Sequence, residues 1–204
     1  MKKGARGYTT IEVMMALAIL AVGTTGVIAL QKVALIGNAT GRLGDAARGV
    51  GSTWVERLKA DAIQWNDPLG KPDIGDTKWL KGAVVQTPGQ PAKSNQWILA
   101  PEVPGWSSPV ADVNGIDVFT NDDPKRGVFC THLRLLQAID KPIALSGVPH
   151  RIAVQAEVRV VWRRDLSPML ECRTTSPVNI EENDERYAFF HPGRVTILQQ
   201  EASN

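Results

Sequence analysis

Residues 11–30 read IEVMMALAILAVGTTGVIAL, a mostly apolar run of twenty residues near the start of the chain. A helix of that length is long enough to cross a bilayer. Glu12 is the one charged residue in the run, and a lone charge inside a membrane span costs several kcal/mol unless it finds a partner. The run therefore predicts a membrane-spanning helix that makes use of its single carboxylate.

The residues before the run help to decide which kind of N-terminal targeting segment it belongs to. They form a basic leader, MKKGARG, followed by Tyr8-Thr9-Thr10. A secretory signal peptide has a shorter apolar stretch of about 7–15 residues and a cleavage site after it. This run is longer, and Glu12 falls where such signals avoid acid. A plain signal anchor explains the leader and the length but gives Glu12 no role.

The register of these parts resembles the class III signal of type IV prepilins and pseudopilins. In that family a dedicated peptidase cuts after the Gly that ends a basic leader and methylates the new N-terminus. The mature chain then carries Glu as its fifth residue. The resemblance implies cleavage after Gly7, methylation of Tyr8 and an assembly role for Glu12. Family members usually begin with Phe, and Tyr8 departs from that while keeping the aromatic ring.

The same resemblance gives Glu12 a partner. It implies that the carboxylate pairs with the methylated amino group of a neighbouring subunit when subunits stack, which neutralises two buried charges at once. Within the family the segment looks most like the PilV-type minor pilins. Farther along the run, Gly23-Thr24-Thr25-Gly26 allows either close helix packing through small residues or a point that melts during assembly.

Beyond Leu30 the apolar residues keep to one face of a helix. They recur at steps of three, four or seven: Ile36, Leu43, Ala47, Val50, Trp54, Leu58 and Trp65. This spacing predicts one helix from about Thr10 to about Trp65, ended by Asn66-Asp67-Pro68-Leu69-Gly70. Several glycines from Gly37 to Gly51 weaken the helix, and we expect a bend in that region.

The remainder of the chain predicts loops followed by strands. Residues 68–109 hold seven of the thirteen prolines, which indicates a connecting region with two short strands at Ala83–Thr87 and Gln96–Ala100. We expect Trp79, Trp97 and Trp106 to anchor these loops. Strands are expected at Val128–Leu136, Arg151–Trp162, Met169–Thr175 and Arg194–Gln199. Arg151–Trp162 alternates cleanly, so Glu157 and Arg159 are expected on a solvated face.

Together these elements predict an α+β fold in which one long helix packs its Trp54/Leu58 face on an antiparallel sheet. Pilin resemblance implies the same architecture. The expected divisions are a cleaved leader (1–7), a transmembrane assembly helix (8–30) and an amphipathic helix half (31–66). A globular head (67–204) follows, made of a Pro-rich connecting region (67–126) and an antiparallel sheet (127–204).

The chain has two cysteines, Cys130 and Cys172. If the head is extracytoplasmic, the simple interpretation is one disulfide between two strands of the sheet or at the edge of the sheet. Two buried free thiols are the alternative.

No residue pattern predicts catalysis, a cofactor or a metal site. The histidines His132, His150 and His191 are far apart and have no metal-ligand spacing. The acidic run 181–185 could offer oxygens to calcium but lacks a defined loop pattern, so we expect a solvated loop. Formal net charge is +2, and the basic leader accounts for it, so nothing indicates nucleic-acid binding.

The leading hypothesis is therefore a non-enzymatic minor pilin of a type IV pilus that supports assembly and twitching motility. We expect a single-pass protein of the bacterial inner membrane with a periplasmic head, which then enters the pilus. Its expected partners are membrane lipid, prepilin peptidase, the inner-membrane assembly machinery, and other minor and major pilins. A minor pseudopilin of a type II secretion system is the alternative. A membrane-anchored adhesin or sensor is a more distant one.

Overall fold

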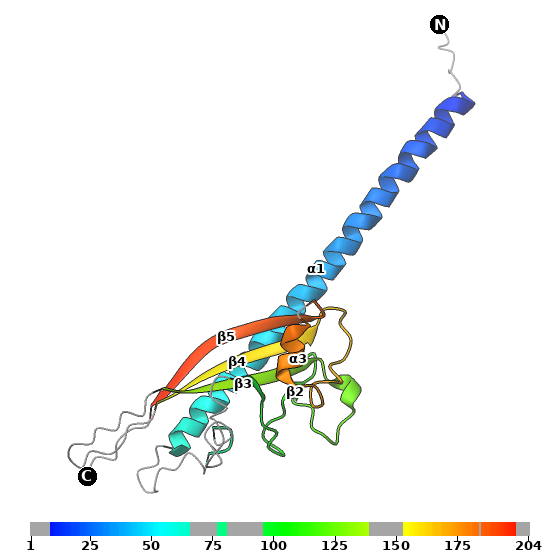
Figure 1. Ribbon diagram of the computed structural model, residues 1–204. Helices are drawn as coiled ribbons and strands as arrows, with labels where there is room; N and C mark the ends of the chain where they lie inside the picture. Colours follow the sequence, from blue (N-terminus) through cyan, green and yellow to red (C-terminus); the bar gives the residue numbers. More distant parts are fainter. Residues whose placement is uncertain (1–8, 66–76, 81–95, 139–152, 184, 199–204) are drawn as a thin grey trace, which may run out of the picture. The chain divides into compact units, whose positions relative to one another are not determined.

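The computed structural model describes residues 9–65, 77–80, 96–138, 153–183 and 185–198. The described elements run in the order α1 (Thr10–Trp65), β1 (Ile98–Leu99), β2 (Val110–Ala111), η2 (Pro124–Arg126), β3 (Phe129–Ala138), β4 (Ala153–Arg163), α3 (Pro177–Glu182) and β5 (Tyr187–Leu198) (Figure 1). This is the predicted α+β arrangement of one long helix and an antiparallel sheet. The chain divides into two compact units, residues 1–43 and 44–204.

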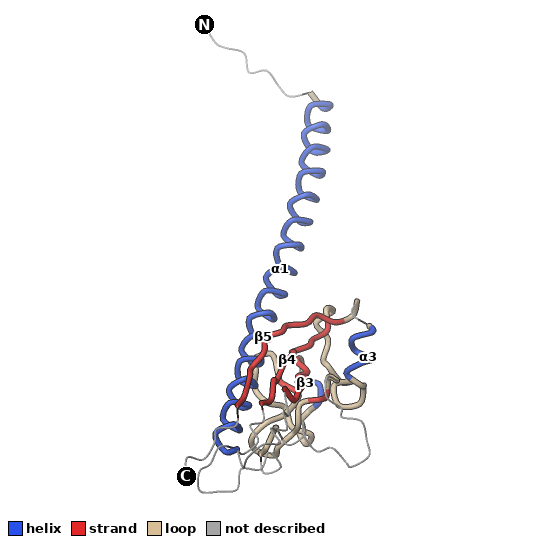
Figure 2. The backbone as a smooth tube through the Cα atoms, turned by 60° about the vertical axis from the view of Figure 1, so that its left-hand side comes forward, coloured by secondary structure: helices blue, strands red, loops and turns tan. Residues whose placement is uncertain are grey.

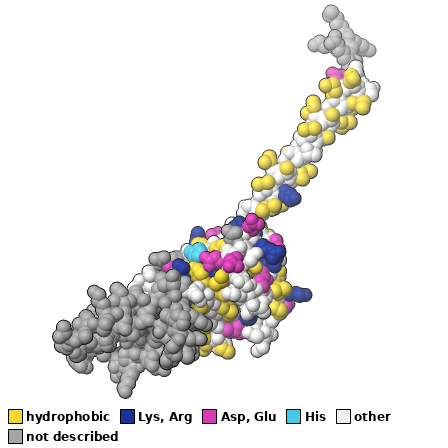
Figure 3. All heavy atoms as spheres, viewed as in Figure 1, with side chains coloured by type: hydrophobic (Ala, Val, Ile, Leu, Met, Phe, Trp, Pro, Cys, Tyr) yellow, Lys and Arg dark blue, Asp and Glu magenta, His cyan; other side chains and the backbone are white. Residues whose placement is uncertain are grey.

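Residues 10–43 of the first unit are helical. Their large apolar side chains from Ile11 to Ile36 are exposed, and Figure 3 shows such side chains along the face of the helix that it displays. α1 is long and apolar enough to cross a membrane. The helix continues through the Gly23–Gly26 segment. There the hydroxyls of Thr24 and Thr25 donate to the carbonyls of Ala21 and Val22, at 2.9 and 2.8 Å. Because these polar groups are satisfied within the helix, the segment is compatible with an apolar environment.

The second unit is built on an antiparallel sheet of order β1-β3-β4-β5, with β2 also paired to β3. β3 and β4 form a long uninterrupted ladder in which Cys130 faces Val161 and Leu133 faces Val158. The β4–β5 ladder has an irregularity between Val158 and Val160. β3 and β4 therefore form the centre of the sheet, and their two faces carry the packing.

One face of the sheet packs against the second half of α1. Beyond residue 43, the helix buries the predicted side chains Ala47, Val50, Trp54 and Leu58. Successive residues of a strand point to opposite faces, so Leu133, Val158 and Val160 supply the facing layer. Gly51 allows a close approach here, because a Cβ at this position would lie 3.0 Å from Pro192 Cγ. Burying a residue such as Leu58 stabilises the fold by about 2–3 kcal/mol.

The other face is covered by residues 164–182, which we call the outer layer. This segment includes α3, which lies on the side of the sheet opposite α1 (Figure 2). Its apolar contacts form a second core with these members: Val110, Val118, Cys130, Val161, Met169, Cys172, Ile180 and Tyr187. The second unit thus has three layers: helix, sheet and outer layer.

The structure corrects the predicted strand at Met169–Thr175. These residues form consecutive turns, in which Cys172 N donates to Met169 O and Thr175 N to Glu171 O. The second partner of β4 is instead β5, which begins at Tyr187, seven residues before the predicted start. The segment lacks the alternation of a half-buried strand, and that pattern argued against the prediction.

Two further expectations were wrong. Glu157 and Arg159 are not on a solvated face but are 5% and 2% exposed, because the outer layer and β1 region cover that side of the sheet. The acidic run is not wholly a loop, since Glu181 and Glu182 end α3. The predicted strand Ala83–Thr87 and the side chain of Trp65 lie outside the described part of the chain.

The tryptophan predictions hold for some residues only. Trp79 is buried, and its Nε1 donates to Ser107 Oγ at 2.8 Å, as expected of a loop anchor. Trp97 is half-buried within the predicted strand Gln96–Ala100, of which only Ile98–Leu99 is paired. Trp106 is 61% exposed, so it does not pin its loop to the core.

Candidate functional site

Glu12 lies in the first turn of α1 and closes a capping box with Thr9. Its Oε2 accepts from the amide and the hydroxyl of Thr9, while its own amide donates to Thr9 Oγ1, all at 3.3 Å. Such a reciprocal pair satisfies amides that the start of a helix leaves without partners. The signature Thr-x-x-Glu was present in the sequence, and the sequence interpretation did not use it.

The electrostatics of this turn also favour a carboxylate. The N-terminus of a helix carries a partial positive charge, which stabilises an acidic side chain nearby. Within the described residues, only Oε2 of Glu12 is engaged, and the side chain is exposed. Its surroundings are apolar: Ile11 and Met14 are 69% and 66% exposed. The arrangement fixes one oxygen and leaves a charged group on an apolar surface. Gly7 and Tyr8 lie outside the described residues.

Cys130 and Cys172 are joined by a disulfide, with 5.6 Å between their Cα atoms. Cys130 is on β3 as expected, but Cys172 lies in a turn of the outer layer and not on a strand. Both residues are buried in the second core. The disulfide therefore ties the outer layer to the middle of the sheet.

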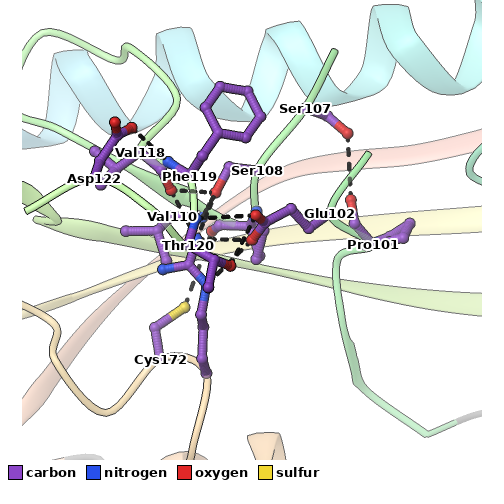
Figure 4. A network of polar contacts seen from close by, with 12 residues as sticks. Pro101, Glu102, Ser107, Ser108, Val110, Val118, Phe119, Thr120, Asp122 and Cys172 are labelled. Carbon is purple, nitrogen blue, oxygen red and sulfur yellow. Dashed lines mark hydrogen bonds and ion pairs between the residues drawn. The ribbon is translucent and has the colours of Figure 1, made fainter. Parts of the chain in front are cut away.

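A polar network around Glu102 fastens the loops that flank the disulfide (Figure 4). The carboxylate accepts from the amide and hydroxyl of Thr120, at 3.0 and 2.8 Å, and from Arg173 Nη2 at 2.8 Å. Arg173 also donates to Ser108 Oγ and Val118 O. Burial acts to raise the pKa of Glu102, but the hydrogen bonds from Arg173 and Thr120 outweigh it, so the pKa is lowered. The charged form of Glu102 is thus part of the fold.

A second polar cluster, made of His132, Arg134, Glu157, Arg159 and Glu181, lies between the sheet and the outer layer. On β3 and β4, Arg134 pairs with Glu157 directly across the ladder. One step along, Arg159 donates from Nε to His132 Nδ1 at 3.0 Å and pairs with Glu181 of α3 at 3.2 Å. Burial, together with the charge of Arg159, lowers the pKa of His132 to about 3.

Trp97 covers this polar cluster, with the guanidinium carbons of Arg134 and Arg159 at 4.7 and 4.4 Å from its ring centroid. The cluster was not predicted from the sequence because Arg159 was expected to be solvated. The available signal was the cross-strand match of opposite charges at positions 134 and 157.

Asp61 anchors the end of α1 to the loop beyond it. Its carboxylate is buried and accepts from three consecutive amides, those of Lys78, Trp79 and Leu80, at 2.6–2.9 Å. This contact fixes the buried Trp79 in place. It is a structural role, which a polar residue near the end of a helix does not reveal in the sequence.

The described residues contain no cluster of three or more His, Cys, Asp or Glu that could hold a metal ion. His132 is buried, His191 is exposed on β5, and His150 lies outside the described ranges. No family model, curated protein or solved structure matches this chain.

Proposed function

We propose that this protein is a minor pilin of a type IV pilus. In this proposal, prepilin peptidase removes residues 1–7 and methylates Tyr8. The mature subunit stays in the bacterial inner membrane with a periplasmic head until it enters the filament or its initiation or tip complex. There it contacts other minor and major pilins, and it supports pilus assembly.

One observation carries the proposal. Glu12 is the only ionisable residue between Thr10 and Gln31, and α1 displays it on an exposed apolar surface. Transfer of that surface into a membrane or a packed filament leaves the charge without water, so it needs a cationic partner. A methylated α-amino group of a neighbouring subunit is such a partner. The disulfide supports an extracytoplasmic head, because disulfides persist in oxidising compartments.

Replacement of Glu12 tests the proposal. We expect Glu12→Ala to reach the membrane fraction at the wild-type level and to be absent from sheared filaments. Glu56→Ala is the matched control, because it makes the same change at an exposed position of the same helix. Normal filament incorporation of Glu12→Ala contradicts an assembly role for this carboxylate.

A minor pseudopilin of a type II secretion system would use the same N-terminal chemistry. A deletion strain separates the two: loss of pili and twitching motility supports the pilus, and loss of exoprotein secretion supports the secretion system. A membrane-anchored adhesin or sensor would instead keep its leader uncleaved or function normally with Glu12→Ala.

A further inference from the structure

A histidine, an arginine and the disulfide form a continuous buried connection between the sheet and the outer layer. His132 Nδ1 accepts from Arg159 Nε at 3.0 Å, and His132 Nε2 lies 3.4 Å from Cys130 Sγ. Arg159 also donates to Pro177 O at 2.8 Å and to Glu181 Oε2 at 3.2 Å. Both of these acceptors belong to α3, so Arg159 on β4 holds the outer layer through α3, while its cross-strand neighbour His132 on β3 fixes the guanidinium from the side of the sheet.

This geometry requires a neutral His132. Because Nδ1 accepts a hydrogen bond, the ring proton is on Nε2 and faces the Cys130 sulfur. Protonation would direct a second N–H at Arg159 Nε and place two cations side by side. His132 is 0% exposed and Arg159 is 2% exposed, so water does not screen that repulsion. The lowered pKa of His132 agrees with this geometry.

The charged groups on neighbouring elements do not offset an extra proton at His132. Arg134 on β3 and Arg159 on β4 are cationic, while Glu157 pairs with Arg134. Glu181 on α3 pairs with Arg159, and His191 on β5 faces the same cluster. In the described ranges, neither carboxylate forms a hydrogen bond with the His132 ring. Among the described residues, an imidazolium would therefore lie beside two arginines whose carboxylate partners are already engaged in ion pairs.

We propose that His132 is an acid-sensitive latch whose protonation releases the outer layer from the sheet, while the Cys130–Cys172 disulfide keeps the two tethered. The closed form holds His132 neutral, and the open form exposes it to water with its ordinary pKa of about 6.5. Because the closed-state pKa is the lower one, closure is favoured above pH 6.5 and weakens as pH falls from 6.5 toward 3. The open population then rises up to about tenfold per pH unit. This device does not depend on the proposed assembly role.

Reduction of the disulfide reports on opening, because both cysteines are buried in the closed form. The full-length protein in detergent is treated with a water-soluble phosphine between pH 7.5 and 4.5. Each rate is divided by that of the denaturant-unfolded protein at the same pH, which removes the reagent's own pH dependence. We expect this relative rate to rise by up to about 100-fold between pH 7.5 and 4.5, mostly below pH 6.5.

Variants identify the side chain whose protonation causes the rise in the reduction rate. In His132→Gln, the amide can accept from Arg159 and donate to the sulfur without titrating, so the relative rate should stay flat with pH. His191→Gln removes a neighbouring titration without touching the contacts of Arg159 with His132 and α3, so it should keep the acid rise. The proposal is overturned by an unchanged rate in the wild type, an equal rise in His132→Gln, or loss of the rise in His191→Gln.

If His132→Gln is open at every pH, NMR of the wild-type protein tests the protonation state of His132 instead. NMR of the wild-type imidazoles should show His132 as the Nε2–H tautomer, still neutral at pH 5. A His132 ring that titrates near pH 6.5 in the closed protein would contradict the latch.

Discussion

In the first turn of α1, the Glu12 side chain caps the helix and also carries a negative charge. A substitution to Ala would remove both at once. Its Oε2 accepts from the amide and hydroxyl of Thr9, which stabilises the helix start. Its charge lies on an apolar surface, where the proposed function assigns it a partner in another subunit. The hydrogen bonds depend on an acceptor oxygen, whereas the partner depends on the negative charge.

Paired substitutions separate these effects. Glu12→Gln keeps an acceptor oxygen for Thr9 but removes the charge, so we expect loss of filament incorporation. Thr9→Ala removes the cap at a cost of about 1 kcal/mol of helix stability but keeps the charge, so incorporation should persist. Sheared-filament fractions of the two strains, compared at equal membrane levels, measure the difference. The reverse pattern would assign the function of Glu12 to capping.

Arg173 tests the importance of the network around Glu102. Arg173→Ala leaves Glu102 Oε2 without its donor and removes one of the two donors to Val118 O, so we expect a loss of about 1–3 kcal/mol in the free energy of unfolding. Lys59→Ala is the control, because it removes one partner of the exposed Lys59–Glu56 pair. Such pairs contribute about 0–1 kcal/mol. Denaturant unfolding followed by Trp fluorescence gives both values, and equal values would contradict the network's role.

At the scale of elements, two glycines of α1 differ in what surrounds them. A Cβ on Gly49 would have no atom within 4 Å, whereas one on Gly51 would lie 3.0 Å from Pro192 of β5. Gly49→Ala should therefore stabilise the protein by about 0.5–1 kcal/mol through helix propensity. Gly51→Ala should lose that gain to the close contact with β5. The same unfolding measurement applies, and equal stabilisation by both substitutions would contradict the observed packing of α1 on β5.

The sequence predicted the elements whose patterns are local. The spacing from Ala47 to Leu58 identified the buried face of α1, and alternation identified β4. Alternation does not reveal what covers the polar face of a strand, so the burial of Arg159 could not be predicted. That burial depends on the outer layer, which is held by a disulfide and ion pairs between distant residues. At the candidate site, the position of Glu12 five residues after Gly7 identified it as a site residue. The Thr9–Glu12 capping box was also visible in the sequence but was not predicted.

At the scale of the whole molecule, the outer layer of the head depends on long-range connections. Arg159–Glu181, Arg173–Glu102 and the disulfide attach it to the sheet and to the preceding loops. α1 needs none of these for its own hydrogen bonds. We therefore expect damage to the disulfide to affect the outer layer before the contact between helix and sheet.

Removal of the disulfide tests this expectation. The cysteines are 42 residues apart, and loop entropy predicts that Cys130→Ala/Cys172→Ala lowers the free energy of unfolding by about 4 kcal/mol. Hydrogen exchange should show lost protection in residues 169–182 and retained protection in residues 47–58. Uniform loss of protection across both segments would contradict a separately attached outer layer.

Processing and assembly as a pilin require a specific mature N-terminus, which can be measured. Intact-mass and N-terminal peptide mass spectrometry of the protein isolated from its native membrane would identify the first residue. If the protein is a pilin, the chain begins at N-methylated Tyr8, without residues 1–7. A chain that begins at Met1 with its leader intact would contradict the proposed function.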